Sequence, residues 1–223
     1  MPDGPLSLPA RLHLLAWDSA GREATGAPHL HHLVRAGALT ELARRGLLAD
    51  DDGIATPADP DAHTGDPVLD GLLELVGESF PHRWRTWVTL RARVTLDAVR
   101  EQLVAEGFLR AERKRVLGVF PSVDHTLRRT AAAQALREEV RHILTGPVPA
   151  SRVPARDAAV AVLAAAAGLR ALPPAGERAG LRTRVEELTD RAGDASPALS
   201  RVVRELRTAV GASVPPVPVP AGG

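Results

Sequence analysis

Leucine and valine recur three and four residues apart in segment after segment, and each segment ends at glycine or proline. The clearest example runs from about Pro28 to Arg45 and stops at Gly46. Its apolar side is formed by Leu30, Leu33, Val34, Ala38 and Leu42. This spacing is that of a helix with one buried face. The pattern therefore restricts the chain to a mainly α fold.

Further helices are expected on both sides of this segment. Leu8–Trp17 follows Ser7 as an expected N-cap, and Asp66 with Pro67 predicts the start of a helix that extends to Val76. Two helices are expected between Pro81 and Gly107. The C-terminal third predicts helices at Ala131–Leu144, Pro154–Leu172, Leu181–Ala192 and Pro197–Ala209.

Two short β-hairpins interrupt the helices. The first joins Leu47–Ala49 to Ile54–Thr56 through a turn at Asp50–Gly53. The second is expected to have a charged turn at Glu112–Arg115 and an apolar second strand, Val116–Phe120, that ends before Pro121. This apolar strand has two possible roles, as a buried edge strand at a subunit contact or as a tip that enters a membrane.

The length of 223 residues suits a single compact multi-helix domain. We expect this domain at residues 6–212, after a flexible N-terminus at 1–5 and before a Pro-rich disordered tail at 213–223. No apolar run of about 18 residues occurs, nor does the start resemble a secretory signal. The expected location is the cytoplasm.

Composition and motifs exclude several functional classes. The absence of cysteine removes disulfides, thiolate metal sites and thiol nucleophiles, and a net charge of +1 disfavours a general nucleic-acid binder. His29, His31 and His32 are not spaced to share one helix face, so no metal site is predicted. No nucleophile elbow or dinucleotide motif occurs. We expect neither an enzyme nor a cofactor.

A basic aromatic segment is the strongest candidate for chemistry. Arg83, Arg85, Arg91 and Arg93 surround Trp84 and Trp87. Arginine binds phosphate through paired donors, and tryptophan is common at membrane interfaces. The alternative is a solvated helix face with its tryptophans in the core.

The order of several motifs resembles a bacterial form of the Golgi phosphoprotein 3 family over roughly residues 6–210, and an actinobacterial source is expected. The motifs are Leu6–Leu8, Gly37–Leu47, Thr64–Asp70, Trp87, Leu103–Leu109 and Leu117–Pro121. The family fold is a mostly helical domain with short β-hairpins, which agrees with the elements expected above.

The resemblance implies a peripheral membrane protein that binds phosphatidylinositol 4-phosphate through an arginine pocket. Arg35 and Arg93 match two basic pocket positions, whereas Gly26 and Leu96 stand where the family has tryptophan and a second basic residue. The family hairpin that touches the bilayer corresponds to Val116, Leu117, Val119 and Phe120. The implied partners are an anionic inositol phospholipid at the inner face of the membrane, a second copy of the chain, and a membrane-enzyme client.

Two other functions remain open at this point. A helix followed by a hairpin occurs twice, as in winged-helix nucleic-acid binders, although Asp50, Asp51 and Asp52 place acid at the first hairpin. The departures at Gly26 and Leu96 also favour an interaction or oligomerisation module without lipid specificity.

Overall fold

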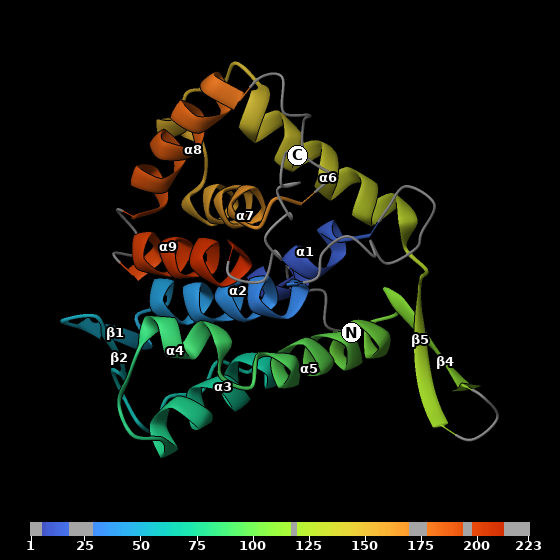
Figure 1. The fold of residues 1–223 in the computed structure, drawn as a ribbon. Coiled ribbons are helices and arrows are strands. Elements are labelled where there is room, and N and C mark those ends of the chain that lie inside the picture. The colour runs from blue at the N-terminus through green and yellow to red at the C-terminus, as the bar shows by residue number, and fades with distance from the viewer. Residues whose placement is uncertain (1–5, 18–28, 117–119, 170–177, 194–197, 212–223) are drawn as a thin grey trace, which may run out of the picture.

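Helix α2 (Leu30–Arg44) is the centre of the fold (Figure 1). It contacts α1 (Leu8–Leu15), α3 (Pro67–Glu78), α4 (Trp84–Thr89), α5 (Ala92–Ala105), α7 (Ala155–Ala166) and α9 (Ala198–Gly211). Every residue from Leu33 to Leu42 is buried. The computed structural model describes residues 6–17, 29–116, 120–169, 178–193 and 198–211.

The remaining helices form layers around α2. Helices α3, α4 and α5 lie on one side, while α6 (Thr130–Thr145), α7 and α8 (Arg178–Gly193) lie on the other (Figure 1). A short 3₁₀ helix, Ala150–Arg152, precedes α7. This arrangement confirms the mainly α single domain predicted from the sequence. Among the described residues, no helix is both long and apolar enough to cross a bilayer.

Helices α1 and α2 approach each other closely at Gly37. A Cβ atom at this position would lie 2.5 Å from the Leu12 side chain and 3.3 Å from the Pro9 backbone. Glycine therefore allows the two helices to pack. At the start of α3, the Asp66 carboxylate accepts hydrogen bonds from the amides of Val68 and Leu69, which confirms the predicted cap.

The first hairpin belongs to a three-stranded sheet. Strand β2 (Ile54–Pro57) pairs antiparallel with β1 (Leu48–Asp51) and with β3 (His82–Arg83), which the sequence did not predict. The turn is tighter than expected and consists of Asp52 and Gly53, both with positive φ, 49° and 88°. Such a turn suits the twist of a two-residue hairpin.

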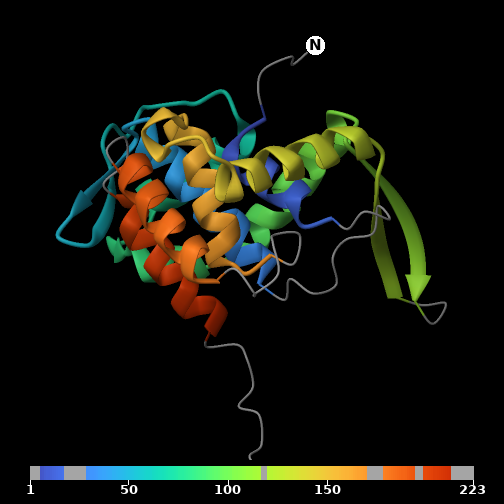
Figure 2. The ribbon, with the colours of Figure 1, turned by 90° about the horizontal axis from the view of Figure 1, so that it is seen from above.

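The second hairpin differs from the prediction. Strand β4 (Leu109–Val116) includes the charged segment predicted as the turn, and β5 (Phe120–Leu127) continues past Pro121. Val116 therefore ends β4 and Phe120 begins β5, whereas the prediction placed both in the second strand. Figures 1 and 2 show this hairpin projecting from the helical body, at the opposite end from β1 and β2. Charged side chains are favourable in a two-stranded ribbon exposed to water on both faces.

Several other expectations fall partly or wholly outside the described residues. Helix α7 ends at Ala166 and is shorter than the predicted Pro154–Leu172, because the chain leaves the helix at Gly168, which has a positive φ of 63°; residues 170–172 lie outside the described part. The predicted flexible residues 1–5 and the predicted tail at 213–223 also lie outside the described part.

Candidate anion-binding site

Two oppositely charged residues are buried in α2, and the charge of one of them is balanced by ion pairs. Glu41 has no exposed surface, and its Oε1 accepts hydrogen bonds of 2.9 Å from Arg44 and Arg45. Arg156 of α7 approaches the other oxygen at 3.6 Å. Burial alone would raise the pKa of Glu41, but these arginines together lower it. The carboxylate is therefore held ionised in the core.

Arg35, in contrast, has little to balance its charge. Its side chain is 1% exposed, and one terminal nitrogen donates a hydrogen bond of 2.8 Å to the carbonyl oxygen of Arg91. Its Nε and its other terminal nitrogen find no hydrogen-bond acceptor in the described structure. Burial lowers the pKa of Arg35 to about 10, so the guanidinium stays charged at neutral pH. A buried cation with unused donors is a binding site for an anion.

The start of α5 adds to this positive environment. Arg91 precedes the helix in a left-handed conformation with φ 49°, and no side chain caps the helix. The first turn of α5 contains no acidic residue. Because helix N-termini present unpaired amide groups and a partial positive charge, this end of α5 attracts anions.

Arg93 and three histidines lie at the same end of α5. The rings of His31 and His32 are 4.0 Å apart, and His29 stacks on His32 at 5.9 Å. His31 and His32 begin the helical turn that precedes Arg35, and both interact electrostatically with Arg93 of α5.

The pKa values of two of these histidines are lowered by their surroundings. Burial, followed by the charges of His32, Arg93 and His29, lowers the pKa of His31 to about 4. Burial, His29 and Arg93 also lower the pKa of His32. Both imidazoles are therefore neutral at pH 7, because protonation would add charge to an already cationic cluster.

The structure brings together the two arginines singled out by the sequence. Arg35 contacts the residue before α5, and Arg93 lies in its first turn. Leu96 is 5% exposed and belongs to the core, so it contributes no charge, and Gly26 lies outside the described residues. The arrangement can hold a phosphate group between two guanidinium groups and a helix N-terminus.

Comparison with protein families agrees with the resemblance seen in the sequence. The family model for Golgi phosphoprotein 3 (GPP34) matches residues 8–206. The chain belongs to the Golgi phosphoprotein 3 family. A search of curated proteins finds no match.

In this family member, the tryptophans of the basic aromatic segment are not at the surface. Trp84 and Trp87 are 1% and 0% exposed, and the Trp84 indole donates a hydrogen bond of 2.9 Å to Asp50. The interpretation of the tryptophans as membrane-interface residues is therefore wrong, because both complete the core around α2 and α4. Arg83 and Arg85 are exposed, and of this segment's arginines only Arg91 and Arg93 flank the start of α5.

The four hairpin residues are only partly described. Val116 and Phe120 form the last pair of the β4–β5 ladder, while Leu117 and Val119 lie outside the described residues.

The sequence did not link the histidines to the arginines. Their electrostatic interaction with Arg93 depends on the packing of α2 against α5. No cluster of three or more metal-ligating side chains is found in the part of the chain that the structure describes.

The two buried charges of α2 should respond differently to removal. We expect Arg35→Met to leave the free energy of unfolding unchanged or to raise it by up to about 3 kcal/mol, because it removes an unbalanced buried charge. Glu41→Gln, the matched control, should lower it by about 3–5 kcal/mol, because it leaves buried arginines without their partner. Urea unfolding measures both. A loss of more than about 1 kcal/mol in Arg35→Met would show that the native fold needs this guanidinium.

Proposed function

We propose that this protein attaches to anionic membranes by binding a phosphoinositide headgroup, of the phosphatidylinositol 4-phosphate kind, with Arg35 and Arg93. The observation that carries the proposal is the unused donor capacity of the buried Arg35 guanidinium at the start of α5. A phosphate monoester supplies several acceptor oxygens and up to two negative charges. It would satisfy these donors and the uncapped helix end at once.

The hairpin supplies the second contact in this proposal. Val116 and Phe120 form the last pair of its ladder, Leu117 and Val119 stand between them in the sequence, and Arg113, Lys114 and Arg115 precede them in β4. Apolar residues beside a basic run are typical of segments that enter the boundary of an anionic bilayer. Each basic residue near such a surface contributes about 1 kcal/mol, so neither contact alone gives firm attachment.

The remaining parts of the proposal concern partners and location. The protein acts at the cytoplasmic face of the membrane and is not an enzyme. A second copy of the chain and a membrane-enzyme client are its proposed protein partners. Nucleic acid is disfavoured as a partner because the first hairpin exposes Asp51 and Asp52.

Cosedimentation with vesicles tests the headgroup site. At equal surface charge, we expect stronger binding to vesicles with phosphatidylinositol 4-phosphate than to vesicles with phosphatidylinositol or phosphatidylglycerol. Arg93→Ala should weaken binding about fivefold through loss of one surface charge. Arg35→Met should weaken it roughly tenfold or more and abolish the headgroup preference, because charge-assisted hydrogen bonds are lost.

Arg182→Ala provides the matched control, since Arg182 is an exposed arginine on α8, in the layer on the other side of α2 from α5. It should bind like the unchanged protein. Equal binding to all three anionic lipids would leave only nonspecific attachment. Absence of binding to any of them would favour an interaction module instead.

The hairpin is tested by Phe120→Asp. We expect this variant to bind vesicles roughly tenfold more weakly, because one apolar side chain no longer enters the bilayer. Its affinity for soluble inositol 1,4-bisphosphate, measured by calorimetry, should be unchanged. Val123→Asp is the control, since Val123 is 51% exposed and lies three residues further from the turn. Equal losses in both variants would argue against insertion of the turn.

The histidines predict a dependence on pH. Burial and, after it, the neighbouring cations lower the pKa values of His31 and His32 in the free protein, so a bound anion should raise these pKa values and favour protonation. The charged neighbours are His29 on their own segment, Arg93 on α5 and Arg35 one turn along α2. Vesicle binding by the unchanged protein, relative to the double variant His31→Gln, His32→Gln, should therefore strengthen from pH 7.5 to 5.5. The ratio of the two affinities cancels the effect of the titration of the phosphate itself, which is the same for both proteins. A ratio that does not change with pH would disprove the coupling between the histidines and the bound anion.

A further inference from the structure

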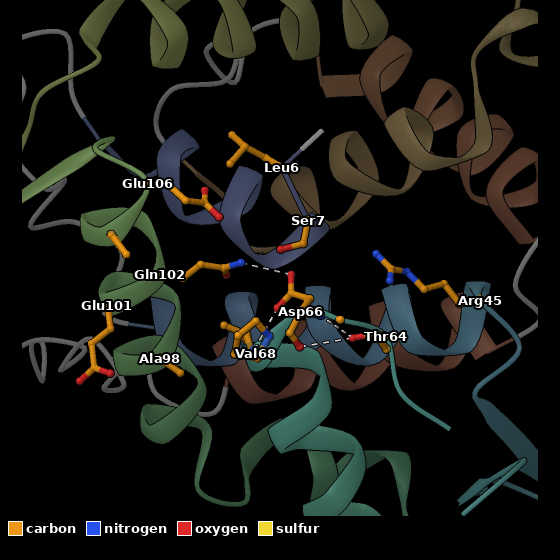
Figure 3. A pocket seen from close by; sticks show the side chains of 13 residues that line it. Leu6, Ser7, Arg45, Thr64, Asp66, Val68, Ala98, Glu101, Gln102 and Glu106 are labelled. Atoms are coloured by element: carbon orange, nitrogen blue, oxygen red, sulfur yellow. Dashed lines mark hydrogen bonds between the residues drawn. The ribbon is translucent and has the colours of Figure 1, made fainter. Parts of the chain in front are cut away.

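A separate cavity lies at the other end of α5. It has a volume of about 720 Å³ and lies between the residues before α1, the start of α3 and the C-terminal half of α5 (Figure 3). Glu106, which lines the cavity, lies 13 positions after Arg93, which corresponds to roughly 20 Å along the helix axis. The cavity is therefore distinct from the arginine site.

Carboxylates give this cavity a negative character. Asp66, Glu101 and Glu106 line it, and neither Glu101 nor Glu106 forms an ion pair with another described residue. Burial, followed by the charge of the neighbouring Asp66, raises the pKa of Glu106, and a hydrogen bond with Gln102 and the charge of Arg129 offset this only in part. Arg45 also lines the cavity, but its guanidinium is already bound to Glu41 at 2.9 Å and lies on the opposite side from Glu106 (Figure 3).

Asp66 is held in place by its structural bonds. One carboxylate oxygen caps α3, and the other accepts a hydrogen bond of 3.3 Å from the Gln102 side-chain nitrogen. This bond also fixes the Gln102 amide, whose oxygen is buried and has no donor partner among the described residues. The cavity thus has a fixed amide group in its lining, beside the carboxylates.

Ser7 supplies a second unused polar group. The sequence predicts that its hydroxyl caps α1, but the side chain makes no capping bond. Ser7 is 6% exposed, and its Oγ has no hydrogen-bond partner in the described structure. In Figure 3 this hydroxyl points toward the space shared by Gln102, Asp66 and Glu106. A buried hydroxyl that does not cap its helix keeps its hydrogen-bonding capacity for a ligand.

We propose that this cavity binds a primary alkylammonium group. An ammonium group has three N–H donors and one positive charge, which match the Glu106 carboxylate, the Ser7 hydroxyl and the Gln102 amide oxygen. Leu6, Val68 and Ala98 line the cavity beside them and provide apolar surface for the alkyl chain. The ammonium group belongs either to a free amine or to a lysine side chain.

Chemical-shift titration of the full ¹⁵N-labelled chain tests this proposal. The probes are pentylamine, Nα-acetyl-lysine N-methylamide, and pentanol as the uncharged match. We expect pentylamine to shift the amides around the cavity saturably and to bind at least tenfold more tightly than pentanol. Comparable affinity of the lysine derivative would assign the site to a side chain, and much weaker affinity would assign it to a free amine.

Variants locate the binding and separate it from folding. Glu106→Gln should weaken pentylamine binding about tenfold, and Ser7→Ala about two- to tenfold. Glu186→Gln, on the exposed surface of α8, is the matched control and should change nothing. Ser7→Ala should leave the melting temperature unchanged or higher, whereas a serine that acts as a helix cap would lower it.

Three results would overturn the proposal. These are equal affinity for pentylamine and pentanol, equal affinity in Glu106→Gln and Glu186→Gln, or saturable binding of Ca²⁺ at these residues without any binding of amines. The proposal does not depend on membrane attachment, since Arg35→Met should bind pentylamine like the unchanged protein.

Discussion

The burial of α2 on all sides is the constraint on which the rest of the structure depends. A helix in this position has no solvated face, so any charged residue that it carries must find a partner within the protein. Glu41 meets this requirement through Arg44, Arg45 and Arg156. Arg35 meets it only in part, with one carbonyl oxygen. Glu41 therefore belongs to a structural ion-pair cluster. Arg35, six residues before it on the same helix, keeps the unused donors on which the proposed binding site depends.

Helix α5 connects the features that face outward. Its start lies against Arg35 and carries Arg93, while its end leads through Phe108 into β4, with the Arg129 guanidinium 4.6 Å from the Phe108 ring. The proposed headgroup site and the proposed membrane hairpin are therefore fixed to one rigid element. Glu101 and Glu106, two of the carboxylates that line the second cavity, lie near the C-terminal end of the same helix and at its C-cap. The proposed anion site and the proposed ammonium site therefore lie at opposite ends of α5, each in surroundings of the opposite charge.

Local patterns in the sequence predicted most of the elements, because periodicity and capping act within a few residues. The Asp66 cap and the helix at Leu30–Arg44 are examples. The errors arise where local patterns compete with tertiary structure. Val116–Phe120 has the composition of a strand, but the register of Leu109 with Leu127 places it around the turn. Ser7 has the ideal type for a cap, yet its hydroxyl points into a cavity formed by residues about 60 and 100 positions away.

The candidate site shows the same limit more sharply. The positions of Arg35 and Arg93 came from the family resemblance, since nothing local shows that residues 58 positions apart meet. The periodicity assigned α2 a single buried face, and a helix of that kind allows Arg35 to reach water. What makes Arg35 unusual is the packing of further helices, α4 and α9 among them, over the remaining faces of α2. The proposed role of Arg35 depends on this packing, because only a guanidinium kept from water and from acid retains donors for an incoming anion.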